Sequence, residues 1–167
     1  MAKVFVGKPL TPQQFMAQWR HLPHKFQVNL WNFEVKAGRE AVSIFKESFD
    51  LKRLNTKGSK TWQRRKDRKP HPLLDETSSL KNSIKWKHSS NKSKPSGVTI
   101  YTDPKGFKNT KRHRGFCYAA VHNAPSGTYR YGNTGARSIR RQYIGHSTVL
   151  RDKLSELSVI IFNGFPK

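Results

Sequence analysis

The stretch Lys25–Leu51, KFQVNLWNFEVKAGREAVSIFKESFDL, decides the fold class of this chain. Its apolar residues recur at steps of three and four, the spacing that places side chains on one face of an α-helix. A stripe of this kind is far more often a buried face or a subunit contact than a cofactor site. The stretch therefore predicts one long amphipathic helix. The members of its apolar face are Phe26, Leu30, Phe33, Ala37, Ala41, Ile44, Phe45 and Phe49.

A shorter helix is predicted just before it. Thr11 can cap this helix, Pro12 suits the first helical position, and Gln14 can complete a capping box. Pro23 is expected to end the segment, because proline interrupts a helix interior. The apolar stripe of this short helix consists of Phe15, Met16, Trp19 and Leu22.

Charge is unevenly distributed along the 167 residues, a length that suits one domain. The chain has 33 Lys and Arg against 10 Asp and Glu, a net charge of +23. Residues 1–51 contain 7 basic and 4 acidic side chains, whereas residues 52–153 contain 25 and 5. So basic a middle section indicates a polyanion or an acidic protein surface as partner. From charge alone, nucleic-acid contact and a solvated or protein-facing surface remain equally open.

Residues 52–72, KRLNTKGSKTWQRRKDRKPHP, show no periodicity and contain nine Lys or Arg and one Asp. Such a run is typical of a loop or arm, ordered only within an assembly. Trp62 is the exception, because a tryptophan in such a loop generally docks onto another surface.

Strands are predicted in the second half of the chain. After a short helical turn, Ile84–His88 and Val98–Thr102 alternate apolar and polar residues, which indicates a β-hairpin. FCYAAVH, residues 116–122, is predicted as a third strand, and QYIG, residues 142–145, as a short fourth. The glycine-rich segment between them is expected to be a loop.

A C-terminal helix is predicted from about Ser147, with Gly164 and Pro166 supplying the stop. The whole chain is then a single α+β domain. Its parts are a helical part at 11–51, a basic loop or arm at 52–72, a small antiparallel sheet of three to four strands with loops at 73–145, and the C-terminal helix at 147–163.

No catalytic, cofactor or metal site is predicted. Asp75 and Glu76 are adjacent, so they point in different directions on a regular element, and negative charge there suits the start of a turn. Cys117 and His122 would face opposite sides of a strand. His113, Cys117 and His122 match no common zinc spacing and lack a fourth ligand.

Three segments, in order, resemble the phage virion morphogenesis (tail completion) family. The first, FDLKRLNTKGSKTW, supplies Phe49, Gly58 and Trp62. The second is similar to a leucine-rich family segment and is matched by Leu73, Leu74, Thr77, Leu80, Ser83 and Ile84. The third joins YAAVHN to RQYIG and is matched by Tyr118, Ala119, His122, Arg141, Gln142, Tyr143, Ile144 and Gly145. The family has proline where this chain has Gln142, and glycine where it has Ser78.

This resemblance implies a structural virion protein without chemistry. Such a subunit assembles into a homo-oligomeric ring at the head–tail interface, where it stabilises the tail end and allows head joining. The partners implied are neighbouring neck, connector and tail proteins, with nonspecific contact to DNA in the lumen and none with a membrane. Assembly in the host cytoplasm is expected, in keeping with the single cysteine.

The basic loops are the predicted contacts to an acidic partner ring or to DNA, with Trp62 as the docking anchor. These contacts are Arg64, Arg65, Lys66, Arg68 and Lys69 in the first loop and Lys108, Lys111, Arg112 and Arg114 in the second. One alternative is a sequence-nonspecific nucleic-acid binder. The other is a small basic RNase or toxin, which would need His122 or His88 as an acid or base.

Overall fold

The computed structural model describes residues 11–64, 74, 78–106, 119–131 and 136–165. It confirms the predicted α+β class. In chain order the elements are α1 (Pro12–Arg20), α2 (Leu22–Leu51), α3 (Ser79–Asn82), β1 (Ile84–His88), β2 (Val98–Thr102), the 3₁₀ turn η1 (Pro104–Gly106), α4 (Ala119–Asn123), β3 (Arg130–Tyr131), β4 (Ala136–Arg137), α5 (Thr148–Leu157) and the 3₁₀ helix η3 (Ser158–Phe162).

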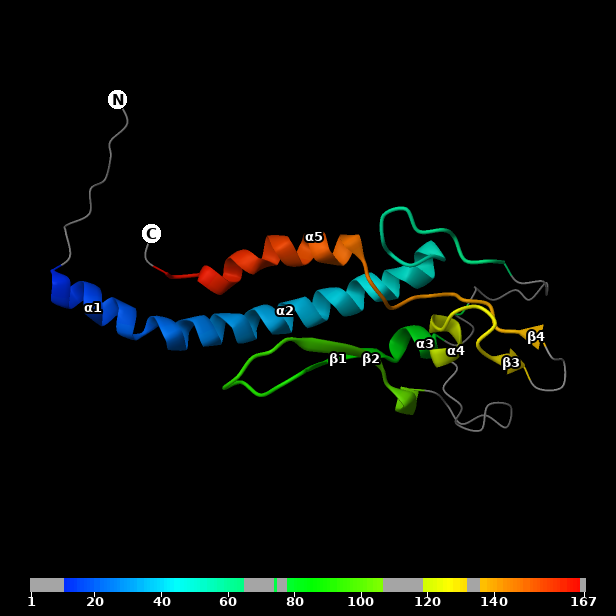
Figure 1. Cartoon of the computed structure of the whole chain (residues 1–167), viewed down its shortest axis with the longest axis horizontal. Helices are drawn as coiled ribbons and strands as arrows, with labels where there is room; N and C mark the ends of the chain where they lie inside the picture. Colours follow the sequence, from blue (N-terminus) through cyan, green and yellow to red (C-terminus); the bar gives the residue numbers. More distant parts are fainter. Residues whose placement is uncertain (1–10, 65–73, 75–77, 107–118, 132–135, 166–167) are drawn as a thin grey trace, which may run out of the picture.

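Helix α2 is the axis of the molecule. Its 30 residues span about 45 Å at 1.5 Å per residue. Helix α5 and η3 lie along one side of it and the β1–β2 hairpin along the other (Figure 1). The predicted face is buried at Ala37, Ala41, Ile44, Phe45 and Phe49, so the periodicity identified the core side of the C-terminal half of this helix. None of the helices in the described residues is long and apolar enough to cross a membrane.

The junction between α1 and α2 lies earlier than predicted, because Leu22, predicted in the short helix, is the first residue of α2. Thr11 forms the predicted capping box with Gln14, and α1 ends at Arg20. Pro23 does not end this segment but lies in the first turn of α2, which begins at Leu22. Proline is tolerated there, because the first N–H groups of a helix have no partner within it.

The β1–β2 hairpin has the predicted bounds, and Trp86 pairs with Ile100 across it. Alternation places Lys85 and Lys87 on the exposed face, whereas Ile84 is buried against α2. The short turn predicted before β1 is helix α3. The predicted C-terminal helix is also present as α5, with Ser147 as its N-cap, and its last turns adopt the 3₁₀ form of η3.

Two strand predictions were wrong. Ala119–Asn123, which overlaps the predicted third strand, forms helix α4; two successive alanines favour a helix more than a sheet. Residues 142–145 form no strand, because their polar groups are satisfied by side chains. The Tyr143 N–H donates to Asn123 Oδ1 at 3.3 Å, and the Gln142 carbonyl accepts from Trp62 Nε1. A two-residue pair, β3 with β4, forms instead where a glycine-rich loop was expected.

An ion pair at the end of the hairpin makes stability depend on pH. Lys85 Nζ donates to Asp103 Oδ2 at 2.6 Å, and the Lys105 N–H donates to the other oxygen at 3.0 Å. The hydrogen bond from Lys85, followed by that from Lys105, lowers the pKa of Asp103 below its usual value. A lowered carboxylate pKa stabilises the fold at neutral pH, and this contribution is lost as pH falls through the folded pKa.

We therefore expect Asp103→Asn to destabilise the protein at pH 7 and to lose that effect in acid. The measurement is the free energy of unfolding of both proteins by urea at pH 7 and near pH 3, below the ordinary carboxylate pKa. The difference in free energy of unfolding between the two proteins at pH 7 should be small, because Lys85 is half exposed and solvent screens the pair. A gap of equal size at both pH values would contradict the assignment.

Candidate assembly surfaces

Seven of the residues that carry the family resemblance pack together in one core. Phe49 lies at the C-terminal end of α2, and Tyr143, only 1% exposed, approaches it with ring centroids 5.3 Å apart. The Tyr143 hydroxyl hydrogen-bonds Thr102 at the end of β2. Three separate stretches of sequence therefore meet at a single cluster. The seven residues are Phe49, Trp62, Leu74, Leu80, Ile84, Ala119 and Tyr143.

Trp62 lies in this core, where its side chain is 7% exposed. Its ring meets Phe49 edge to face at 5.8 Å, and its Nε1–H donates to the Gln142 carbonyl at 3.0 Å. The sequence correctly identified a tryptophan that docks, but the surface it docks onto is the chain's own. Trp62 is thus an internal anchor of the loop, and not the docking anchor to a partner or DNA that was predicted.

Other residues of the resemblance shape the chain around this core. Ser83, 1% exposed, donates its hydroxyl to the Leu80 carbonyl. Gly58 has φ of +74°, a conformation that side chains rarely adopt, and it permits the turn before Trp62. At Gly145 a Cβ atom would lie 2.0 Å from the Gln142 side chain, so the turn needs glycine while Gln142 keeps that position.

Arg141 is only 8% exposed and is held by backbone groups. The backbone N–H of Arg141 donates to the His122 carbonyl of α4 at 2.8 Å, and its side-chain Nε donates to the Gln63 carbonyl at 3.4 Å. Arg141 therefore joins α4 to the loop that follows α2. His122 is half-buried, and Tyr118 lies outside the described residues.

The described part of the basic loop, residues 52–64, is fastened to the start of α5. The Thr148 N–H donates to Thr56 Oγ1 and the Lys57 N–H donates to Thr148 Oγ1, both at 3.0 Å. Lys57 also pairs with Asp152 at 2.9 Å, and this pairing lowers the pKa of Asp152. The first half of the predicted arm is therefore folded onto the subunit without a partner.

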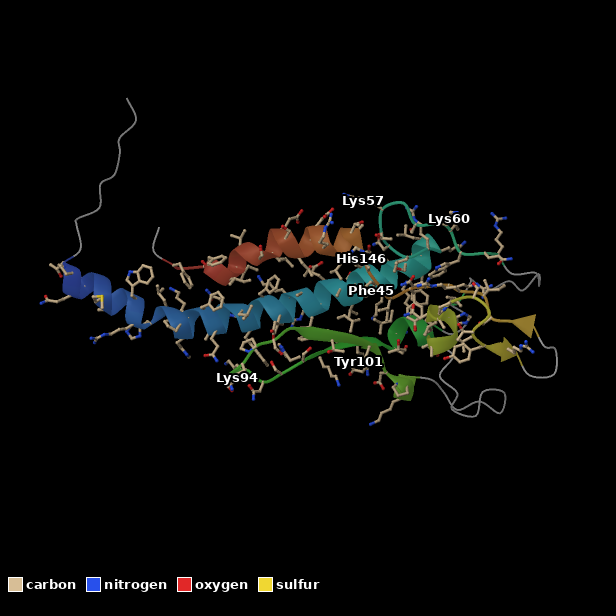
Figure 2. All side chains as sticks on the ribbon, in the orientation of Figure 1. Phe45, Lys57, Lys60, Lys94, Tyr101 and His146 are labelled. Carbon is tan, nitrogen blue, oxygen red and sulfur yellow. The ribbon has the colours of Figure 1, made fainter. Side chains whose placement is uncertain are left out.

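The exposed basic residues of this loop lie around the C-terminal end of α2, which we call the basic end. It consists of Lys52, Arg53, Lys57, Lys60 and Arg64. Figure 2 shows Lys57 and Lys60 on the loop beyond α2, whereas Lys94 lies on the distant hairpin connection. Arg64, a predicted contact, is exposed. The other predicted contacts lie outside the described residues: Arg65, Lys66, Arg68, Lys69, Lys108, Lys111, Arg112 and Arg114.

The opposite end of the molecule exposes large apolar side chains. Met16 and Trp19 on α1 are 59% and 50% exposed, and Phe26 at the start of α2 is 39% exposed. Val159 and Phe162 of η3 are 72% and 62% exposed. Helix α1 and η3 lie at this end of the structure (Figure 1). We call these five residues the apolar end.

A buried carboxylate that the sequence analysis missed fixes the hairpin to α2. Glu34, 3% exposed, accepts from the Gly97 N–H at 2.6 Å and lies 2.9 Å from His88 Nδ1. The His88 ring stacks on Trp31 at 3.5 Å. The signal was present, because Glu34 lies four residues after Leu30 and three before Ala37, on the predicted core face. These contacts give His88 a structural function.

In the described ranges, no group of three or more His, Cys, Asp or Glu side chains is arranged to hold a metal ion. Comparisons of the chain with protein-family models, with curated proteins and with solved structures found no match.

Proposed function

We propose that this chain is a structural virion protein of a tailed phage, a tail completion or neck component that assembles into a ring at the head–tail interface. The observation that carries the proposal is the contrast between the two ends of α2. One end exposes Met16, Trp19, Phe26, Val159 and Phe162, and the other exposes basic side chains. A ring subunit needs an apolar contact with its neighbours and a second surface for the rest of the particle.

The core also supports a structural role for this protein. The residues through which the sequence resembles the tail completion family are mostly buried, and they join α2, the loop, α3, β1, α4 and the segment before α5. Buried residues that pack several elements together hold the fold in place. A structural role for the protein agrees with this use of its most distinctive residues.

The basic end is assigned to an acidic neighbouring ring or to DNA phosphate in the lumen. Arg53, Lys60 and Arg64 are exposed and project from a loop that Thr148 and Trp62 hold in place. A fixed loop orders its charges before binding, which lowers the entropy lost on contact. Contacts of this kind to phosphate carry no sequence information.

The test is quantitative mass spectrometry of purified particles from the source that encodes the chain. We expect a low, fixed copy number that matches one ring and is far below that of the capsid and tail-tube proteins. A ring of defined size has one stoichiometry, so the ratio to another neck protein should not vary between preparations. Absence of the chain from infectious particles would refute the proposal.

A sequence-nonspecific nucleic-acid-binding protein is the second candidate, and the observation that favours it is the charge of residues 52–153. In that case the isolated chain should bind DNA with an affinity that falls steeply with salt, by a log–log slope of about −0.9 per phosphate neutralised. The chain would then remain in the cell lysate with nucleic acid and be missing from particles.

A further inference from the structure

We infer that the apolar end is the contact between neighbouring copies of this chain, with α1 of one copy lying across η3 and the start of α2 of the next. The inference rests on the ring proposed above and assigns its subunit interface to particular residues. Three observations support it: the exposed apolar side chains of α1, the division of the apolar end into two patches, and the distribution of charge along the chain.

Helix α1 has only nine residues and exposes two large apolar side chains. Helices of this length are marginal in water unless tertiary contacts cover an apolar face. Yet Met16 and Trp19 are at least half exposed, and α1 projects beyond the layers formed by α5 and the hairpin (Figure 1). A covering surface on another molecule would bury these two side chains and add to the stability of α1.

The second patch has the form of a receiving surface. Phe26, Phe162 and Phe165 form an aromatic cluster with ring centroids 5.9 to 6.4 Å apart. Lys25 Nζ donates to the Gly164 carbonyl, and Asn29 Nδ2 donates to the Ile161 and Asn163 carbonyls, so η3 is fixed to α2. The exposed rings and Val159 are therefore held in place, and a fixed apolar surface binds at a lower entropic cost.

Charge identifies the occupant as a second copy. Chains of net charge +23 repel one another, so two copies can approach closely only where charge is sparse. Across residues 11–33 the charged side chains are Arg20 and Lys25, and Lys25 is engaged by Gly164. Glu156, an exposed acid two residues before η3, pairs with Lys153 at 3.2 Å, and in the inferred contact it would also meet Arg20 from the end of a neighbouring α1.

Two different patches on one subunit make the contact heterologous. Met16 and Trp19 of α1 would contact Phe26, Val159 and Phe162 of the next copy, which leaves each subunit one patch of each kind for its two neighbours. Heterologous contacts close into rings when the rotation between subunits permits. A contact of α1 with α1 would instead stop at a dimer.

The first experiment is sedimentation velocity of the full chain after nuclease treatment, in salt at about 0.5 M to screen repulsion between copies. We expect the wild type to associate and Met16→Ser/Trp19→Ser to associate at least about 30-fold more weakly, the effect of losing one central interface anchor. The matched control is Leu51→Ser/Tyr129→Ser, which changes exposed residues outside the apolar end and should associate like the wild type. A monomeric wild type, or equal loss in the control, would overturn the inference.

A second experiment maps the contact without relying on the folding of that variant. Copies carrying Trp19→Cys are mixed with copies carrying Phe162→Cys, both in a Cys117→Ser background, and treated with a bismaleimide. Cross-links between the two kinds of copy support the heterologous contact, and cross-links only within one kind overturn it. Co-sedimentation of a monomeric wild type with phosphatidylcholine vesicles, lost on Trp19→Ser, would assign the apolar end to a lipid surface instead.

These outcomes are distinct from failure of the proposed function. A chain that is present in particles at fixed copy number, but is monomeric as wild type, keeps its virion role and loses this interface. A chain that associates through the apolar end, but is missing from particles, keeps the interface and loses the virion role.

Discussion

Replacing Trp62 with Ala should lower the free energy of unfolding by about 3–5 kcal/mol, the usual cost of removing a large aromatic side chain from a core. Trp62 is buried beside Phe49 and hydrogen-bonds the Gln142 carbonyl. Its loss would leave a cavity and an unsatisfied carbonyl at the point where the loop meets the segment before α5. The measurement is urea unfolding followed by circular dichroism.

Two control variants separate the effect of the cavity from the effect of the unsatisfied carbonyl. Trp62→Phe keeps most of the ring packing but removes the indole N–H. Its loss in free energy of unfolding should therefore be smaller than that of Trp62→Ala, by the amount that the ring packing contributes. The remainder, about 1–3 kcal/mol, is the cost of an unpaired buried acceptor. Tyr129→Ala removes an aromatic side chain that is 38% exposed and should change stability little. A loss below about 1 kcal/mol for Trp62→Ala would exclude Trp62 from the core.

Gly38→Ala should destabilise the protein by about 1–3 kcal/mol, even though alanine is the stronger helix former by about 1 kcal/mol. Gly38 is buried within α2, and a Cβ atom there would lie 2.4 Å from Cδ2 of Trp86 and 2.8 Å from its Cγ. These atoms belong to the inner part of the side chain, so the whole indole would have to move. Trp86 meets His88 edge to face, and His88 is held by Glu34 and Trp31.

A double-mutant cycle identifies the clash as the cause. In a Trp86→Leu background the methyl group has room, so Gly38→Ala should become neutral or stabilising through its helix propensity. The unfolding free energies of the four proteins give the coupling, which should be positive and comparable to the single-mutant loss. Equal effects of Gly38→Ala in both backgrounds would show that the hairpin does not press on α2 at this position.

The sequence pattern was sufficient to predict an element wherever nearby residues in the chain determine its structure. The apolar period of Lys25–Leu51 predicted α2 and its core side, alternation predicted the β1–β2 hairpin at its observed bounds, and Thr11 predicted the start of α1. Each depends on interactions within a few residues or on a period of the backbone itself. The buried Glu34 could have been recognised in the same way from its place on the α2 face.

Tertiary structure alone decided the rest, because the deciding contacts join residues far apart in the chain. The sequence predicted a strand at residues 142–145. In the structure the Tyr143 N–H donates to Asn123 and the Gln142 carbonyl accepts from Trp62, so no strand pairs with these residues. Trp62 reads as a docking residue, but only the position of Phe49 and the Gln142 carbonyl shows that it docks internally. The apolar end likewise depends on α1, α2 and η3 meeting in space. Sequence thus determined α1, α2, the β1–β2 hairpin and α5, whereas packing determined which apolar side chains the core buries and which remain exposed for a partner.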